Sequence, residues 1–202
     1  MKSQLKVPSG TAGTITVDPS KSEFHRALIC AAFSNAPTTL QLSSNSSEEF
    51  LLSDDIRSTI SCLTQLGAEV KIHSSALTVI PRTFSVPHPV LNCGESGSTL
   101  RFLLPVTCAL SRSASFLGRG NLPRRPISEL TEVLKKNGVE FSYETLPFST
   151  TGRLIPGTYT LPGNISSQYI SGLLMALPLL RNPARIQTTT PLSSRSYVDI
   201  TA

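Results

Sequence analysis

The sequence contains no hydrophobic run long enough to cross a membrane as a helix. Its longest apolar stretch is GLLMALPLL at residues 172–180, whereas a spanning helix needs about 20 residues. The N-terminal segment MKSQLKVPSG also lacks the apolar centre of a secretory signal peptide. These absences predict a cytoplasmic, soluble protein with no membrane partner.

Cysteine is sparse, and its spacing excludes the common cysteine-based sites. None of the four residues belongs to a C-x-x-C pair, which argues against a zinc site or a disulfide framework. Most lie in apolar stretches, so we expect buried free thiols in a reducing compartment. No cluster of His, Cys or carboxylate residues has metal-ligand spacing, so no metal is expected. The cysteines are Cys30, Cys62, Cys93 and Cys108.

Charged residues make up only 15% of the chain, and no long basic run occurs. The 18 Lys and Arg residues exceed the 13 Asp and Glu residues, which gives a net charge of +5. The cations are scattered and are not interleaved with aromatic residues, so nucleic-acid binding is not expected. The excess positive charge instead suits a small anionic ligand. The 39% of hydrophobic residues is typical of a globular protein with a core.

Two segments of the chain repeat at an offset of 71 positions. DDIRSTISCLTQLGAEV at 54–70 matches RPISELTEVLKKNGVEF at 125–141. Each pattern predicts an amphipathic helix that ends near a glycine, Gly67 or Gly138, and is followed by a short strand. We expect both helices to lie on the outside of the domain.

Three other segments are apolar on nearly all sides, and each opens with small polar residues. They start near residues 22, 96 and 166 and are predicted to be buried helices, each followed by a strand. The repeating unit is therefore buried helix, strand, outer helix, strand and further β residues, with a period of about 70 to 75 positions. This predicts an α/β domain whose units cover residues 14–90, 91–160 and 161–202.

The third unit differs from the others near its end. Asp199 and Ile200 match Asp55 and Ile56, so the third outer helix is predicted to start where the sequence stops. A unit without its outer helix would expose apolar surface. We therefore interpret the chain as part of a longer protein.

Cations and hydroxyls gather at the starts of the three buried helices. Ser20 and Ser22 suit a helix cap, but Lys21 and Arg26 have the wrong charge for a helix N-terminus. If the helices run parallel, their N-termini converge and offer N–H groups to a phosphate or carboxylate. A cap or a surface arginine explains any single position, and the threefold recurrence favours an anion site. The candidates are Lys21, Ser22, Arg26, Gly97, Ser98, Arg101, Arg125, Ser166, Ser167, Gln168 and the turn at 193–197.

Other titratable residues lie near these helix starts. His25 falls on the polar first turn of the first buried helix and is expected near the ligand. The pair Asp54 and Asp55 marks a helix start, with Asp55 expected to contact Lys21 or a nearby arginine. Asp199 is likewise interpreted as a helix-start carboxylate.

Five ordered motifs resemble the N-terminal half of the 3-phosphoshikimate 1-carboxyvinyltransferase (EPSP synthase) family. The motifs are PSKSEFHRALICAA, SGSTLRFL, RRPISELTEVLKKNG, PGNISSQYISGLLMALPLL and SSRSYVDIT. The resemblance implies an inside-out α/β fold of βαβαββ units, with parallel buried helices, outer sheets and a second domain that this chain lacks. It also implies transfer of the enolpyruvyl group of phosphoenolpyruvate to the 5-hydroxyl of shikimate 3-phosphate, without a cofactor. In that reaction C3 of phosphoenolpyruvate is protonated, the hydroxyl attacks C2 and phosphate leaves.

The resemblance also implies roles for individual residues. Lys21 would contact both substrates and take part in proton transfer. Contacts to phosphoenolpyruvate would come from Gly97, Arg125 and Gln168. Contacts to shikimate 3-phosphate would come from Ser22, Arg26, Ser166, Ser167, Gln168, Ser194 and Tyr197.

Two departures and two alternatives accompany this resemblance. The loop NCGESGST at 92–99 is longer than the NAGT loop common in the family, and the second half that supplies the acid–base carboxylates is missing. We therefore expect this chain alone to bind substrate without turnover and to need the C-terminal half as its partner. The sister UDP-N-acetylglucosamine enolpyruvyl transferase carries a loop cysteine, which residues 118–126 lack. A non-catalytic ligand-binding fragment is the other alternative.

Overall fold

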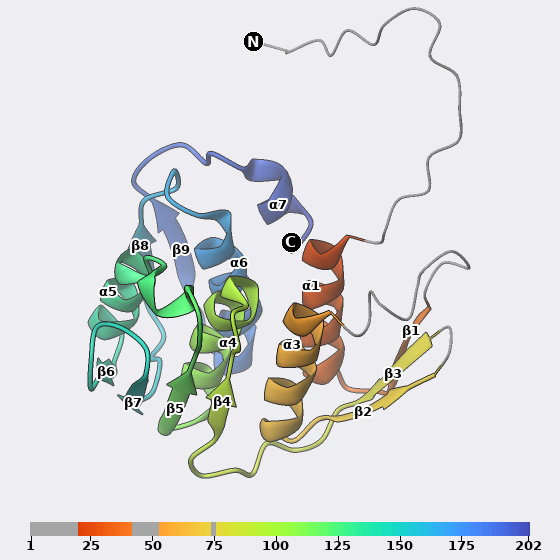
Figure 1. Cartoon of the computed structure of the whole chain (residues 1–202). Coiled ribbons are helices and arrows are strands. Elements are labelled where there is room, and N and C mark those ends of the chain that lie inside the picture. The colour runs from red at the N-terminus through yellow and green to blue at the C-terminus, as the bar shows by residue number, and fades with distance from the viewer. Residues whose placement is uncertain (1–19, 42–52, 74–75) are drawn as a thin grey trace, which may run out of the picture.

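Helices occupy the middle of the molecule and the sheets lie outside them (Figure 1). The computed structural model describes residues 20–41, 53–73 and 76–202. The helices are α1 (Lys21–Ala32), α3 (Asp54–Gln65), α4 (Gly97–Leu110), α5 (Ser128–Lys136), α6 (Ser167–Ala176) and α7 (Arg195–Asp199), with 3₁₀ turns η1 (Leu122–Arg124) and η2 (Leu177–Leu180). The strands are β1 (Thr38–Gln41), β2 (Glu69–Ile72), β3 (Ala76–Ile80), β4 (Val90–Asn92), β5 (Ser113–Leu117), β6 (Val139–Phe141), β7 (Phe148–Gly152), β8 (Thr158–Leu161) and β9 (Arg185–Thr188). This arrangement confirms the predicted inside-out α/β fold.

The strands form three small sheets with related connections. The first has the antiparallel order β1-β3-β2. In the second, β4 pairs in parallel with β5 through the crossover helix α4, and β7 and β6 continue it antiparallel. In the third, β8 pairs in parallel with β9 through α6. The series β4-α4-β5-α5-β6-β7 is therefore a complete βαβαββ unit, and β8-α6-β9 repeats its beginning.

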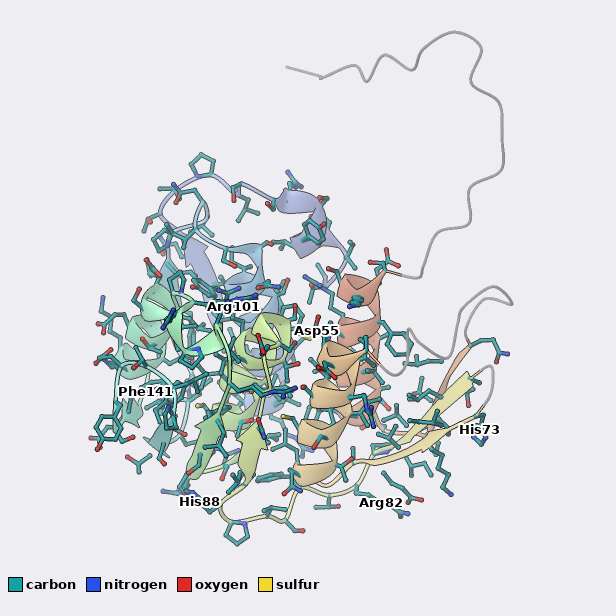
Figure 2. The ribbon with its side chains drawn as sticks, in the orientation of Figure 1. Asp55, His73, Arg82, His88, Arg101 and Phe141 are labelled. Carbon is teal, nitrogen blue, oxygen red and sulfur yellow. The ribbon has the colours of Figure 1, made fainter. Side chains whose placement is uncertain are left out.

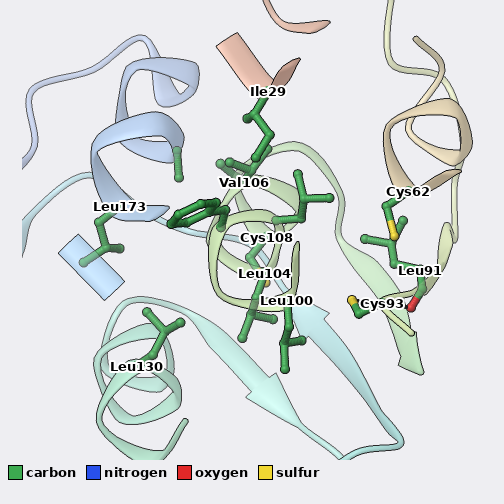
Figure 3. Close-up of a cluster of buried hydrophobic side chains, with 14 of the residues drawn as sticks. Ile29, Cys62, Leu91, Cys93, Leu100, Leu104, Val106, Cys108, Leu130 and Leu173 are labelled. Atoms are coloured by element: carbon green, nitrogen blue, oxygen red, sulfur yellow. Dashed lines mark hydrogen bonds between the residues drawn. The ribbon is translucent and has the colours of Figure 1, made fainter. Parts of the chain in front are cut away.

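Helix α4 forms the centre of the hydrophobic core. Its residues Leu100, Phe102, Leu103, Leu104 and Val106 are each at most 1% exposed, because α1, α3 and α6 surround the helix. Figure 3 shows α4 side chains meeting apolar side chains from neighbouring elements. The nearly uniform apolar character of the three buried helices is explained by this position.

Helices α4 and α6 approach each other closely at Gly172. A Cβ atom at this position would collide with the backbone carbonyl of Arg101 and lie 3.0 Å from Pro105 Cγ. Pro105 has no N–H to donate to the Arg101 carbonyl, so the helix bond at this turn is missing. The glycine therefore lies directly against a carbonyl that the helix itself does not use.

The outer helices α3 and α5 are amphipathic, as the repeat predicts. The turn after α3 is closed by Gly67 at φ +101°, where Gly67 N and Ala68 N donate to the carbonyls of Thr64 and Leu63. Helix α5 starts at Ser128, three positions later than the repeat predicts. The residue before a proline is pushed into an extended conformation, and the one preceding Pro126 has ψ 133°.

Two expectations near the helix ends are wrong. Asp199 does not begin an outer helix, because it is the last residue of the short helix α7 and pairs with Arg195 at 3.5 Å. Buried Val198 holds this helix against the domain. Cys30 is exposed because it lies on the solvent side of α1, whereas the other three cysteines are buried and all four are free thiols.

The third sheet is open at one side. Within the described residues β9 pairs only with β8. Beside it a pocket of about 440 Å³ is lined by Leu174, Leu177, Pro178, Asn182, Ala184 and Ile186. Among the described helices none is long and apolar enough to cross a membrane.

Candidate functional site

The first turns of α1, α4 and α6 are each capped by a serine. The Oγ atoms of Ser20, Ser96 and Ser166 accept hydrogen bonds from Glu23 N, Thr99 N and Gln168 N at 3.2 to 3.3 Å. Capping therefore accounts for one lone pair of Ser166. Ser22, Ser98 and Ser167 lie inside the first turns, so their hydroxyls do not act as caps.

Side-chain hydrogen bonds bring these helix starts together on one face. Arg101 Nη1 on α4 donates to Gln168 Oε1 on α6 at 2.8 Å, and Gln168 Nε2 donates back to Ser98 Oγ at 2.9 Å. We call this surface the helix-start face. It carries Lys21, Asp55, Gly97, Ser98, Arg101, Arg125, Ser167 and Gln168. The N-termini of the buried helices thus converge as the parallel arrangement predicts.

Two guanidinium groups flank the first residue of α4. A Cβ atom on Gly97 would lie 2.9 Å from Arg125 Nη1 and 3.3 Å from Arg101 Nη1. Neither arginine forms an ion pair with any described residue. Arg101 Nε is also buried without a hydrogen-bond partner. Adjacent cations without a counter-ion, next to free helix N–H groups, favour an anion at this place.

Lys21 extends the positive charge of the helix-start face from α1. Its Nζ lies 3.7 Å from Asp55 Oδ2, and the two side chains are 50% and 43% exposed. This contact confirms the expectation that Asp55 meets Lys21. An exposed pair at this distance holds the ammonium group only weakly, so Lys21 can exchange Asp55 for an anion. Figure 2 shows Asp55 and Arg101 near the helix starts, whereas Arg82 lies beside the first sheet.

Arg26 is placed differently from the other cations, since it is only 4% exposed. Its guanidinium donates to Ser22 O, Ser171 Oγ, Tyr197 O and Thr201 Oγ1 at 2.6 to 3.1 Å, and it stacks 4.7 Å from the Phe102 ring centroid. Four of its five N–H groups are thereby used, which leaves one on Nη1. Arg26 thus ties α1 to α6 and α7.

Helix α7 carries the last predicted site residues beside α1. Ser194 stands at its N-cap position without a side-chain cap bond. Tyr197 is 45% exposed, and its carbonyl accepts bonds from Arg26 and Ser171. The structure therefore brings Tyr197 to the edge of α1 and α6.

His25 does not lie on the exposed first turn as expected. It is 2% exposed, and its Nδ1 lies 2.8 Å from Thr59 Oγ1. Burial lowers the pKa of His25 to about 4; Asp55 opposes this change, and Arg26 and Lys21 add to it. The expectation fails because the helix phase turns this side chain toward α3 and α4.

The sequence matches a known protein family over nearly its whole length. A model of the EPSP synthase (3-phosphoshikimate 1-carboxyvinyltransferase) family matches residues 5–202. The chain belongs to this family. The 3-phosphoshikimate 1-carboxyvinyltransferase of Clostridium perfringens (strain SM101 / Type A) is 38% identical over 205 residues, which cover 100% of this chain and 47% of the relative. That of Clostridioides difficile (strain 630) is 37% identical over 211 residues, covering 98% and 47%.

Solved structures of two other proteins share the fold. The EPSP synthase of Acinetobacter baumannii has a TM-score of 0.71 at 22% identity, over 93% of this chain and 42% of that chain. The enolpyruvyl transferase NikO from Streptomyces tendae has a TM-score of 0.61 at 13% identity, over 92% and 41%. The chain spans about half the length of the curated relatives it matches.

Several residues that build this face were missed from the sequence. Ser171 and Thr201 hold Arg26, while Thr59 bonds His25 and is itself bonded by Thr99. Each of them bonds a partner at least 34 positions away in the chain. No local signal marks such residues, because their roles depend on which helices pack together.

Proposed function

We propose that this chain is the shikimate 3-phosphate-binding half of an enzyme that transfers the enolpyruvyl group of phosphoenolpyruvate to shikimate 3-phosphate. The observation that carries the proposal is the pair Arg101 and Arg125, which flank Gly97 without a counter-ion among the described residues. Both substrates are small phosphorylated acids. Membership of the EPSP synthase family supports the choice of these two.

The proposed binding roles follow the arrangement of the helix starts. Phosphoenolpyruvate would lie near Lys21, Gly97, Arg125 and Gln168, where cations and the α4 N-terminus coincide. Shikimate 3-phosphate would lie across α1, α6 and α7. Its proposed contacts are Lys21, Ser22, Arg26, Ser166, Ser167, Gln168, Ser194 and Tyr197. Arg26 would use its remaining Nη1 N–H group and would also hold α7 in place.

The proposed enolpyruvyl transfer requires stabilisation of negative charge and transfer of protons. A proton adds to C3 of phosphoenolpyruvate while the 5-hydroxyl oxygen forms a bond to C2 and gives up its own proton; the resulting tetrahedral intermediate then loses phosphate from C2 and a proton from the C3 methyl group, which restores the double bond. Lys21 and Arg125 would stabilise the phosphate as it leaves, and Lys21 would take part in proton transfer.

The remaining parts of the enzyme are proposed to lie outside this chain. Units 14–90, 91–160 and 161–202 would form one substrate-binding domain, with the third unit completed by further polypeptide. The C-terminal half would supply acid–base carboxylates and the opposite wall of the site. The free cysteines support a reducing, cytoplasmic location.

A matched pair of arginine variants tests the binding site. We expect Arg125→Gln to weaken phosphoenolpyruvate binding, measured by calorimetry with shikimate 3-phosphate present, by about tenfold through loss of one charge-assisted contact. Arg82→Gln removes another exposed guanidinium, which pairs with Glu69 on the first sheet, and should leave this affinity unchanged. Equal affinities for the two variants would overturn the site.

The substrate class is tested with the unaltered chain. Shikimate 3-phosphate should shift amide signals in the first turns of α1 and α6, whereas UDP-N-acetylglucosamine should not. A response to the second compound alone would instead support the sister activity. A response to neither would contradict the proposed function.

A further inference from the structure

A buried line of polar side chains runs beneath the helix-start face. His25 Nδ1 on α1 lies 2.8 Å from Thr59 Oγ1 on α3, which lies 2.7 Å from Thr99 Oγ1 on α4. Thr99 Oγ1 donates to Ser96 Oγ, the cap of α4, at 2.8 Å. All four side chains are at most 2% exposed. We call this set, His25, Thr59, Thr99 and Ser96, the buried relay.

His25, Thr59 and Ser96 of the buried relay each lie within about one helical turn of a residue of the helix-start face. His25 follows Lys21 by four positions on α1, and Thr59 follows Asp55 by four positions on α3, so each pair shares a helix side. Ser96 directly precedes Gly97. The relay thus connects the starts of three helices at the level just below the Lys21–Asp55 contact.

The hydrogen bonds of the buried relay all donate in one direction, from His25 toward Ser96. Each hydroxyl has one proton to donate. The Thr99 hydroxyl donates to Ser96 Oγ, with the Asp55 carbonyl as a more distant second acceptor at 3.4 Å. Because this uses its one proton, the Thr59 hydroxyl must donate to Thr99, and His25 Nδ1–H must donate to Thr59. Ser96 Oγ then receives both this bond and the Thr99 N–H. Loss of one hydroxyl therefore leaves buried partners unpaired on two helices.

The surroundings of His25 keep the buried relay uncharged. Lys21 and Arg26 on α1 and Asp55 on α3 are the charged groups that act on its ring, and α4 presents the edge-on Phe102 ring at 6.5 Å. Because burial holds the pKa of His25 near 4, the imidazole is neutral at ordinary pH. A neutral relay can order the helix starts without competing for the anion.

We propose that His25, Thr59, Thr99 and Ser96 are positioning residues that hold the starts of α1 and α4 at the spacing with which Lys21 and Gly97 bind one anion. The inference rests on the proposed function, in which that anion is phosphoenolpyruvate. None of the four needs to touch the substrate. They act by fixing the distance between a cation on one helix and backbone N–H groups on another.

The test removes one hydroxyl group while keeping the volume of the side chain nearly unchanged. In Thr59→Val we expect phosphoenolpyruvate affinity, measured with shikimate 3-phosphate present, to fall about tenfold, because α1 and α4 lose their common link. Thr59→Ser restores the hydroxyl and should recover the affinity. The matched control is Thr107→Val on α4, which removes a fully buried threonine hydroxyl that has no hydrogen-bond partner among the described residues.

A second variant and a spectroscopic signal keep the test independent of stability. Thr99→Val should weaken binding to a similar extent while leaving the ¹⁵N shifts of the His25 imidazole near those of the parent chain, because Thr59 remains. Thr59→Val should change these shifts. All variants are compared at a temperature where circular dichroism shows each one to be folded.

The outcomes separate this inference from the proposed function. If the parent chain binds and Thr59→Val binds as well as Thr107→Val, the positioning role is wrong while the proposed function stands. If Thr59→Ser fails to restore binding, the hydroxyl is not the cause and the inference is also wrong. If the parent chain binds neither substrate, both the function and the inference are overturned.

Discussion

Three arginines of the site illustrate how differently single residues of one charge can be used. Arg26 is 4% exposed and gives four hydrogen bonds to backbone and hydroxyl oxygens, so its position is fixed by the fold. Arg101 has a buried Nε without a partner, and with Arg125 it faces Gly97. The first arginine serves mainly as a tie between helices, whereas the other two retain charge for a ligand.

At the same scale, His25 predicts how stability depends on pH. Its pKa of about 4 in the folded chain lies below the ordinary 6.5, so the unfolded chain binds the proton more readily. The free energy of unfolding should therefore fall as pH drops from 6.5 to 4, by about 3 kcal/mol from this group, and not change further below that range. Urea unfolding between pH 8 and 4 measures this effect.

His25→Asn serves as the reference for that experiment. Asparagine can still bond Thr59 but cannot titrate in this range, so its unfolding free energy should depend less on pH between 6.5 and 4. At pH 8, where the imidazole is neutral in both states, the histidine makes no titration contribution. Parallel pH profiles for the two chains would show that the buried imidazole is not what destabilises the protein in acid.

Among the elements, α4 and α6 pack closely because Gly172 lies against the Arg101 carbonyl and Pro105. The same two helices carry Arg101 and Gln168, whose side chains bond across the interface at 2.8 Å. Packing in the core and geometry on the helix-start face are therefore coupled through one pair of helices. A change in their separation should affect both.

Gly172→Ala tests this coupling between elements. The added methyl group must push α6 away from α4, at a cost of about 1–3 kcal/mol, which should outweigh the roughly 1 kcal/mol gained by replacing glycine in a helix. We expect a lower unfolding free energy in urea. Gln65→Ala, at an exposed position of α3, should stay within about 0.5 kcal/mol of the parent. A Gly172→Ala chain as stable as the parent would contradict the close packing.

At the scale of the whole molecule, the candidate binding cations Lys21, Arg101 and Arg125 share the helix-start face. The helix-start face gathers residues from α1, α3, α4 and α6, while the described residues supply Asp55 as the carboxylate in contact with Lys21. The relatives are about twice as long, since this chain covers 47% of them. We therefore place the acid–base groups of the proposed reaction on a second domain.

This division predicts complementation between two polypeptides. The 202-residue chain alone should release no phosphate from the two substrates, because positioning and exclusion of water require both walls of the site. Adding the part of the Clostridium perfringens relative that lies beyond the match should restore phosphate release. The Arg125→Gln chain mixed with the same part should recover much less. Turnover by the lone chain, or none after mixing, would refute this division of roles.

The sequence by itself determined the periodic features of this protein. Apolar spacing identified the three buried helices and their starts, and the glycines at 67 and 138 marked the ends of the outer helices. These features depend on contacts within a few residues or on the side of one helix that is apolar. The converging helix starts followed from them because parallel helices place their N-termini on one face.

Only the tertiary structure decided which polar residues serve the fold and which remain for a ligand. Arg26 and His25 lie next to Lys21 in the same polar segment, yet both are buried by partners such as Thr59, Ser171 and Thr201. These partners come from other elements of the chain, up to 175 positions away. Local patterns do not specify such pairings, because they depend on the rotation and spacing of helices that are set by packing of the whole core.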